Sequence, residues 1–210
     1  MTRPVPIGRN VVVYGPSGSG KSTLGAALAT RLGLPWIELD PIYHARPNWD
    51  DLPVEEFREQ VEQVIAEHRD GWIIDGNYGM VRDLILPWAQ TAILLELPFA
   101  TVYRRLVRRT LGRTLGGTEL WNGNRESFRQ TFLSQQSMLW WGISVWSRTN
   151  RRLREALREE AHSAHVYRLR TAGQVRYLLE NAVLADPGTP SHELPSSAHK
   201  EDDDANLPRR

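Results

Sequence analysis

The nine residues GPSGSGKST, at positions 15–23, constrain the fold of this chain more than any other part of its sequence. They match the pattern G-x-x-x-x-G-K-[ST], and they stand between a β-branched run at residues 10–14 and helix formers at residues 22–32. A strand, a glycine-rich loop and a helix in this order form a phosphate-binding loop, because the glycines let consecutive backbone N–H groups and the helix N-terminus face an anion. The motif therefore predicts a nucleotide-binding protein.

Each position of this phosphate loop has an expected role at the phosphates of ATP. Lys21 is predicted to bridge the β- and γ-phosphates, and the hydroxyl of Ser22 is predicted to bind Mg²⁺. The composition agrees, because only Lys21 and Lys200 of the 26 Lys and Arg residues are lysines, and one of them stands where a phosphate loop needs a compact ammonium group. The predicted ATP site consists of Gly15, Pro16, Ser17, Gly18, Ser19, Gly20, Lys21, Ser22 and Thr23.

Strand and helix patterns alternate along the rest of the chain. Apolar runs predict strands at residues 36–39, 72–74, 91–97 and 165–169, and helical spacing predicts helices at 54–67, 99–111, 126–160 and 175–184. A break near Gly142 in the third of these helices is an open alternative. The apolar block at residues 138–146 indicates a packed core helix or, alternatively, a dimer interface. Strands that alternate with helices indicate the α/β class, with a mostly parallel sheet and right-handed crossovers.

The composition excludes several kinds of chemistry. The chain has no cysteine, so it has no disulfide, thiolate zinc site, iron–sulfur cluster or cysteine nucleophile. Its 26 Lys and Arg residues nearly balance 25 Asp and Glu residues, which leaves no overall charge to attract nucleic acid. No run of 18 apolar residues occurs, so we expect a cytoplasmic protein without a membrane partner, either a monomer or a homodimer.

The last part of the chain differs from the rest. After Ala185 the sequence is rich in proline and polar residues, and Leu194 and Leu207 are its only large aliphatic residues. Such a segment buries too little apolar surface to offset the entropy lost on ordering. We therefore expect a folded domain at residues 1–184 and a disordered tail at residues 185–210.

Several segments together resemble a known family. These are GPSGSGKSTLGAALATRLGLPWIELD, WIIDGNY, TAILLELP, YRRLVRR and ELWNGNRES, and the resemblance covers residues 10–157. They resemble the adenylate-kinase-like P-loop proteins called topology modulation proteins, which are relatives of nucleoside monophosphate kinases and shikimate kinase. The resemblance implies a five-stranded parallel sheet with helices on both faces, a substrate-binding segment and a helical lid at about residues 111–128. It also implies ATP and Mg²⁺ as cofactors.

Two acids are candidates for the chemistry at the predicted ends of strands. Asp75 ends a buried strand beside the phosphate loop and is predicted to hold Mg²⁺ together with Ser22, with a helix cap as the less favoured alternative. Asp40 ends the second strand and is predicted to bind the hydroxyl of the acceptor, with Tyr43 in the same loop, or alternatively to cap a turn. By resemblance, Arg82 is the substrate-binding arginine, or else a solvated helix charge.

Positive charge is concentrated in residues 100–160, which contain twelve arginines and only five glutamates. Arg105 and Arg109 lie one helical turn apart, and Arg125 follows the glycine-bearing stretch after them. Cations stabilise the oxygens of a transferring phosphoryl group, so Arg105 and Arg109 are predicted catalytic residues and Arg125 a substrate-binding residue on the lid. Arginines 148–158 are expected on a solvated helix face.

Two functions are compatible with this pattern. The favoured one is an ATP-dependent kinase that transfers the γ-phosphoryl group to a small acceptor, which is a nucleotide, a nucleoside or another hydroxylated metabolite. Its partners are then ATP and that acceptor. The alternative is a P-loop ATPase or regulatory protein acting on DNA or on a protein, with the arginines as a phosphate-backbone footprint. The absence of a base-reading motif in the sequence favours the kinase.

Overall fold

The computed structural model describes residues 3–46, 51–116, 135–161 and 163–185. Five parallel strands form its central sheet in the order β3-β4-β2-β5-β6. The strands are β2 (Asn10–Tyr14), β3 (Trp36–Glu38), β4 (Trp72–Asp75), β5 (Thr91–Leu95) and β6 (His165–Leu169). Strand β2, the first strand of this sheet in the chain, is therefore central. The chain adds β3 and β4 on one side of β2 and then β5 and β6 on the other side. This change of side creates a crevice at the carboxyl ends of the strands. The α/β prediction and its parallel sheet are confirmed.

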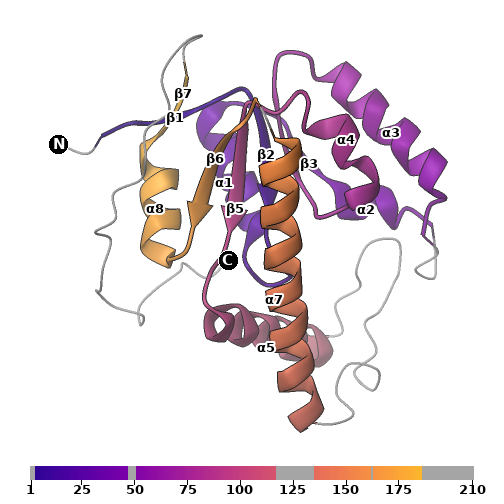
Figure 1. The fold of residues 1–210 in the computed structure, drawn as a ribbon, viewed down its shortest axis with the longest axis vertical. Coiled ribbons are helices and arrows are strands. Elements are labelled where there is room, and N and C mark those ends of the chain that lie inside the picture. Colours follow the sequence, from indigo (N-terminus) through magenta and orange to yellow (C-terminus); the bar gives the residue numbers. More distant parts are fainter. Residues whose placement is uncertain (1–2, 47–50, 117–134, 162, 186–210) are drawn as a thin grey trace.

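Helices cover both faces of this sheet (Figure 1). Val12 and Tyr14 of β2 pack with one set of helices, and Val11 and Val13 pack with the other, because successive strand residues point to opposite faces. The first set is α3 (Val54–Glu67), α4 (Arg82–Ile85) and α7 (Gln135–Glu160), and the second is α1 (Lys21–Leu32) and α8 (Ala172–Asn181). Burial on both faces explains why β2, β4 and β5 are almost continuously apolar.

Two further helices lie beside the carboxyl ends of the strands. The short helix α2 (Leu39–Tyr43) directly follows β3, and a 3₁₀ turn at Gly79–Val81 precedes α4. Helix α5 (Phe99–Gly116) lies beyond the end of β5, next to α7 (Figure 1). Within the described ranges, we find no helix with the length and apolar character needed to cross a bilayer.

A two-stranded sheet was not predicted. Strand β1 (Val5–Ile7) pairs in parallel with β7 (Ala182–Leu184), so the helix expected to continue to residue 184 ends at Asn181. Each strand has only three residues and one partner, and Pro6 lacks a donor, which an edge strand tolerates. So short a pattern gives no periodicity to recognise.

Other predicted boundaries need correction. Helix α7 is continuous through Gly142, because one glycine costs only about 1 kcal/mol in a helix. Helix α5 continues past residue 111, so residues 111–116 of the predicted lid are helical, and the rest of the lid lies outside the described residues. Strand β3 ends at Glu38, and Asp40 belongs to the first turn of α2. The expected tail, apart from Ala185, also lies outside the described residues.

Candidate active site

The phosphate loop joins β2 to α1 at the carboxyl edge of the sheet. Gly18 and Gly20 have φ values of 83° and 97°, which residues with a side chain rarely adopt. A Cβ on Gly18 would also lie 2.9 Å from the carbonyl oxygen of Val102. Gly20 is the N-cap of α1 and has no side chain to cap the first N–H groups of the helix. The loop therefore presents backbone donors of the kind that bind phosphate.

A buried hydroxyl inside the loop supports the same interpretation. The N–H of Ser19 donates to the carbonyl of Pro16 at 3.0 Å, whereas its Oγ is buried and has no hydrogen-bond partner among the described residues. A buried polar atom without a partner is costly unless water or a ligand satisfies it. The loop thus fits the phosphates of a nucleotide at the predicted positions, Gly15 to Thr23.

The two predicted metal residues come together beside this loop. Asp75 is only 2% exposed, and its Oδ2 accepts a hydrogen bond from Nε1 of Trp36 at 3.1 Å. Burial raises the pKa of Asp75 to about 6, while the hydrogen bond from Trp36, the charge of Lys21 and a hydrogen bond from Ser22 oppose this rise. A carboxylate and a hydroxyl at the phosphates suit Mg²⁺, which takes its other oxygen ligands from phosphate and water. No group of three or more His, Asp or Glu side chains suited to a metal occurs in the described part of the chain.

The segment after β4 connects the phosphate loop to Asp40. The N–H of Gly15 donates to Oδ1 of Asn77 at 3.3 Å, and Nδ2 of Asn77 donates back to the carbonyl of Gly15 at 2.6 Å. The next residue, Tyr78, donates from its hydroxyl to Oδ1 of Asp40 at 2.8 Å. Sequence reasoning did not single out Asn77 or Tyr78, although the polar run DGNY directly after a buried strand was a signal for both.

Tyr78, the hydrogen-bond partner of Asp40, belongs to a cluster of aromatic rings. Tyr43 lies at ring-centroid distances of 4.8 Å from Tyr78 and 5.0 Å from Phe57. Asp51 lies 2.8 Å from Nδ1 of His44. Its charge and a hydrogen bond also contribute to the raised pKa of Tyr43, after the larger effect of desolvation. Asp40 and Tyr43, both predicted at the acceptor, are thus neighbours in space.

Arg82 forms an ion pair with Glu160 of α7. Its Nη1 donates to Oε1 of Glu160 at 3.2 Å, and its side chain is 16% exposed. It also lies near the buried hydroxyl of Tyr14, whose pKa burial raises and Arg82 lowers. Its role at a substrate stays a prediction.

One predicted catalytic arginine lies directly on the phosphate loop. Nη1 of Arg105, from α5, donates to the carbonyl of Ser19 at 3.1 Å. This contact places a guanidinium group beside the phosphate-binding backbone. The side chain of Arg109 and the whole of Arg125 lie outside the described residues, so their roles stay predictions.

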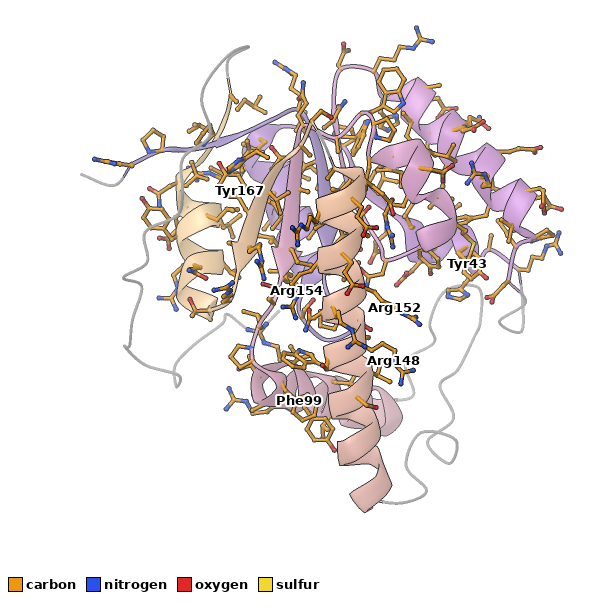
Figure 2. The ribbon with its side chains drawn as sticks, viewed as in Figure 1. Tyr43, Phe99, Arg148, Arg152, Arg154 and Tyr167 are labelled. Carbon is orange, nitrogen blue, oxygen red and sulfur yellow. The ribbon has the colours of Figure 1, made fainter. Side chains whose placement is uncertain are left out.

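Three arginines from α7, from β6 and from the residue after β6 meet at Glu96, the residue that follows β5. Glu96 is 8% exposed and contacts three arginines: Arg154 at 3.0 Å, Arg168 at 2.9 Å and Arg170 at 3.6 Å. We call these four residues the Glu96 cluster. In Figure 2, Arg154 projects from the side of α7 toward β5 and β6, whereas Arg148 and Arg152 project from its other side. The cluster was not predicted, because its members are far apart in the sequence.

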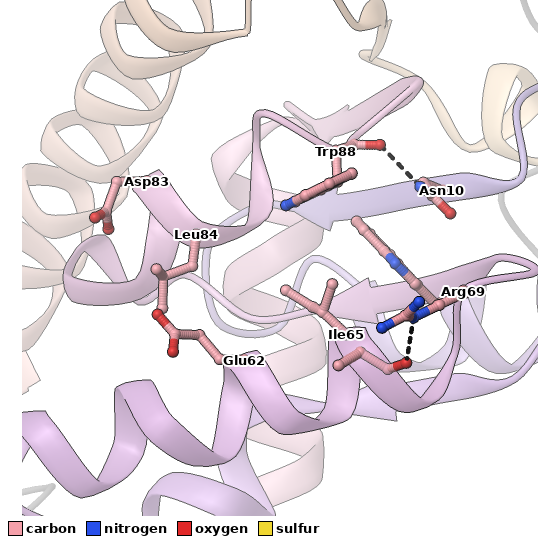
Figure 3. A pocket seen from close by; sticks show the side chains of 9 residues that line it. Asn10, Glu62, Ile65, Arg69, Asp83, Leu84 and Trp88 are labelled. Carbon is pink, nitrogen blue, oxygen red and sulfur yellow. Dashed lines mark hydrogen bonds between the residues drawn. The ribbon is translucent and has the colours of Figure 1, made fainter.

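A large pocket lies away from the phosphate loop, Asp40, Asp75 and the Glu96 cluster (Figure 3). Its volume is about 670 Å³, and Asn10 and Trp72, the first residues of β2 and β4, are part of its lining. The pocket therefore opens at the amino ends of the strands, opposite the phosphate loop. Trp88 and Arg69 line it as well, but it plays no part in the site described above.

Comparison with known proteins finds kinases. The chain is 32% identical over 133 residues to a shikimate kinase from Legionella pneumophila (strain Corby), a match that covers 58% of this chain and 75% of that protein. It is 36% identical over 88 residues to a cytidylate kinase from Stutzerimonas stutzeri (strain A1501), covering 40% of this chain and 33% of that protein. A solved shikimate kinase from Acinetobacter baumannii in complex with shikimate has 18% identity and a TM-score of 0.48, over 82% of this chain and 89% of that one.

These matches differ in how much they cover. No protein-family model matches the chain. The chain spans 33% and 38% of the length of the first two curated relatives it matches, and it matches three quarters of the Legionella protein. Membership of the topology modulation proteins stays a prediction, since none of these matches carries that description. The long match at 32% identity shows that the chain belongs to the family of P-loop kinases that includes shikimate kinase.

Proposed function

We propose that this protein is an ATP-dependent kinase that transfers the γ-phosphoryl group of Mg²⁺·ATP to a hydroxyl group of a small acceptor. One observation carries the proposal. The segment after β4 contacts the phosphate loop through Asn77 and Asp40 through Tyr78, so an acid suited to a hydroxyl group stands beside the nucleotide site. The acceptor is a nucleotide, a nucleoside or another hydroxylated metabolite.

The nucleotide side of the proposed reaction uses the phosphate loop. Lys21 would neutralise charge on the β- and γ-phosphates, and Ser22 and Asp75 would hold Mg²⁺. Mg²⁺ would supply further charge neutralisation at the phosphates. Arg105, which already contacts the carbonyl of Ser19, is assigned to the oxygens of the transferring group.

The acceptor side depends on Asp40. Tyr78 holds Oδ1 of Asp40, and we assign Oδ2 to the hydroxyl of the acceptor. A bond forms between the acceptor oxygen and the γ-phosphorus as the bond from that phosphorus to the bridging oxygen breaks, and the electron pair leaves with ADP. The proton of the acceptor passes to Asp40 and then to water. Tyr43 lines the acceptor site, and Arg82, Arg109 and Arg125 are proposed to approach the substrate or the transferring group as the lid closes.

An acceptor screen tests this function. ADP release from Mg²⁺·ATP is measured with nucleoside monophosphates, nucleosides, sugars and polyols, and the phosphorylated product is identified by mass spectrometry. We expect ADP release that depends on one class of acceptor. ATP hydrolysis that is stimulated by DNA, falls steeply with salt and yields no phosphorylated acceptor would instead support the alternative, a regulatory ATPase.

A further inference from the structure

Trp36 contacts the predicted metal carboxylate from the neighbouring strand. Its Nε1 donates to Oδ2 of Asp75 at 3.1 Å. In the register of β3 with β4, Trp36 lies opposite Ile73, and Glu38 lies opposite Asp75. Residues two apart in a strand share a face of the sheet, so Trp36, Ile73 and Asp75 all lie on the face that α1 covers. The indole therefore reaches along this face toward the carboxyl end of β4.

Gly25 of α1 leaves the space that the indole of Trp36 occupies. This glycine is buried in the second turn of the helix. A Cβ at Gly25 would lie 2.8 Å from Nε1 and 3.1 Å from Cδ1 of Trp36, so either the indole or α1 would have to move. Glycine is less favourable than alanine inside a helix. The close approach of the indole therefore gives a physical reason for a glycine at this position.

The hydrogen bond joins an exposed donor to a buried acceptor. Trp36 is 39% exposed, whereas Asp75 is 2% exposed. An indole at the surface can donate to water, so packing alone does not require its N–H group to face a carboxylate. A buried carboxylate, by contrast, needs hydrogen-bond donors, and Ser22 supplies a second one to Asp75. The bond therefore matters more for the orientation of Asp75 than for the packing of Trp36.

We propose that Trp36 is a positioning residue of the magnesium site and that Gly25 allows the indole to reach this site. The N–H group of Trp36 holds Oδ2 of Asp75 and leaves Oδ1 for the metal, so the carboxylate is oriented before Mg²⁺ binds. The inference rests on the proposed function, in which Asp75 and Ser22 hold Mg²⁺. Trp36 acts through Asp75 and is not itself assigned to the nucleotide or the acceptor.

The contribution of Mg²⁺ to nucleotide affinity tests this role without turnover. AMP-PNP, a non-hydrolysable analogue of ATP, is titrated by calorimetry in excess Mg²⁺ and in EDTA, and the ratio of the two affinities measures the contribution of the metal. Trp36→Phe keeps an aromatic ring and loses the N–H donor. We expect this ratio to fall by about 10-fold, while the affinity in EDTA stays unchanged.

Trp88→Phe is the matched control for this substitution. Trp88 is also exposed, but it lines the pocket at the amino ends of the strands, opposite the phosphate loop. The affinity ratio should be the same in Trp88→Phe as in the parent. An unchanged ratio in a folded Trp36→Phe variant, or an equal fall in both variants, would overturn the inference.

A double variant decides whether Trp36 acts through Asp75. Once Asp75→Asn has removed the carboxylate, the addition of Trp36→Phe should not lower the affinity ratio further. A structural role of the indole would instead lower the ratio in both backgrounds. A fall that persists in the Asp75→Asn background would therefore overturn the positioning role.

Gly25→Ala tests the space that the indole needs. This variant should lower the ratio as Trp36→Phe does. The combination of the two should lose no more than Trp36→Phe alone, because Nε1, the atom nearest to the new Cβ, is then absent. Thermal unfolding without nucleotide shows whether each variant is folded. If Gly25→Ala does not fold, the comparison of Trp36→Phe in the two Asp75 backgrounds still decides the role of Trp36.

Failure of the kinase function gives a different result. If no acceptor is phosphorylated, the proposed function is wrong, and the affinity ratio still decides the role of Trp36. If the parent binds AMP-PNP equally well with and without Mg²⁺, the inference is wrong even when an acceptor is phosphorylated.

Discussion

The hydroxyl of Tyr78 donates a hydrogen bond of 2.8 Å to Oδ1 of Asp40, and so links the segment after β4 to the helix that follows β3. This bond fixes the orientation of a carboxylate that would otherwise rotate in a half-open crevice. Asp40 also raises the pKa of the Tyr78 hydroxyl, after the larger effect of burial, so the hydroxyl remains a donor at every pH at which the protein is expected to work.

Tyr78→Phe should therefore impair the acceptor half of the reaction alone. The ring contacts with Tyr43 and Phe57 are kept, and only the hydroxyl is lost. We expect acceptor-dependent kcat/KM to fall by about 10-fold, with unchanged ATP affinity and melting temperature. Steady-state kinetics measure kcat/KM, nucleotide titration measures the ATP affinity, and thermal unfolding measures the melting temperature. The control is Tyr177→Phe on α8, which removes a hydroxyl that donates to the carbonyl of Arg3. An equal loss in both variants would disprove the positioning role.

Lys21→Met should abolish most ATP turnover while the fold is kept. The substitution removes the ammonium group expected at the β- and γ-phosphates but keeps a side chain of similar length. We expect a loss of at least about 10²-fold in ATP turnover and an unchanged melting temperature without nucleotide. The chain offers a control in Lys200→Met, its only other lysine. Normal turnover in a folded Lys21→Met variant would rule out the phosphate-loop assignment.

Asp40→Asn and Asp75→Asn should separate the two halves of the reaction. Asp75 lies at Ser22 and Lys21, so its variant should weaken the use of Mg²⁺·ATP with every acceptor and in the slow hydrolysis by water. Asp40→Asn should bind ATP normally and lose about 10²- to 10⁴-fold in acceptor-dependent turnover. Nucleotide affinity, basal hydrolysis and acceptor-stimulated rate are measured for both. If Asp40→Asn weakens ATP binding as much as Asp75→Asn does, the assignment of Asp40 to the acceptor site is wrong.

Asp75 should also make the protein without nucleotide less stable as the pH rises. Burial raises its pKa from 3.8 to about 6, so between these values the folded protein keeps a proton that the unfolded chain has released. The free energy of unfolding therefore falls with rising pH across this interval, and Asp75→Asn avoids the loss. We expect the variant to be more stable than the parent by roughly 3 kcal/mol at about pH 7, and by much less at about pH 4.

Urea unfolding in the presence of a chelator measures this difference. Comparing the variant with the parent at each pH cancels the titration of the other groups. A stability difference that stays constant between about pH 4 and pH 7 would show that Asp75 is ionised at its ordinary pKa. Added Mg²⁺·ADP should then stabilise the parent more than the variant.

The phosphate loop and the central sheet could be predicted because their signals are local. Gly15, Lys21 and Ser22 are contiguous with a strand and a helix, and each buried strand is an apolar run in the sequence. The Glu96 cluster could not be found in this way, because its arginines come from α7, β6 and the residue after β6, and only folding brings them together. The pairing of Arg82 with Glu160 likewise depends on how α4 packs against α7.

Residues between elements were the hardest to place. Asp40 was expected at the end of a strand, but β3 has only three residues and α2 begins directly after it. A boundary error of two residues moves a side chain from a strand end into a helical turn. Asn77 and Tyr78 lie in the same kind of connection, where hydrogen bonds to distant backbone and side chains, rather than periodicity, determine the conformation.

The pairing of β1 with β7 also makes the two ends of the described chain neighbours. Val5 lies opposite Ala182 and Ile7 opposite Leu184, so a linker that joins them has to cross only the length of a three-residue strand, about 10 Å. The chain can therefore be closed there and reopened at an exposed loop, giving a circularly permuted protein with the same sheet order and the same phosphate loop. Fusion partners attached directly before β1 or directly after β7 would both emerge from the same small sheet.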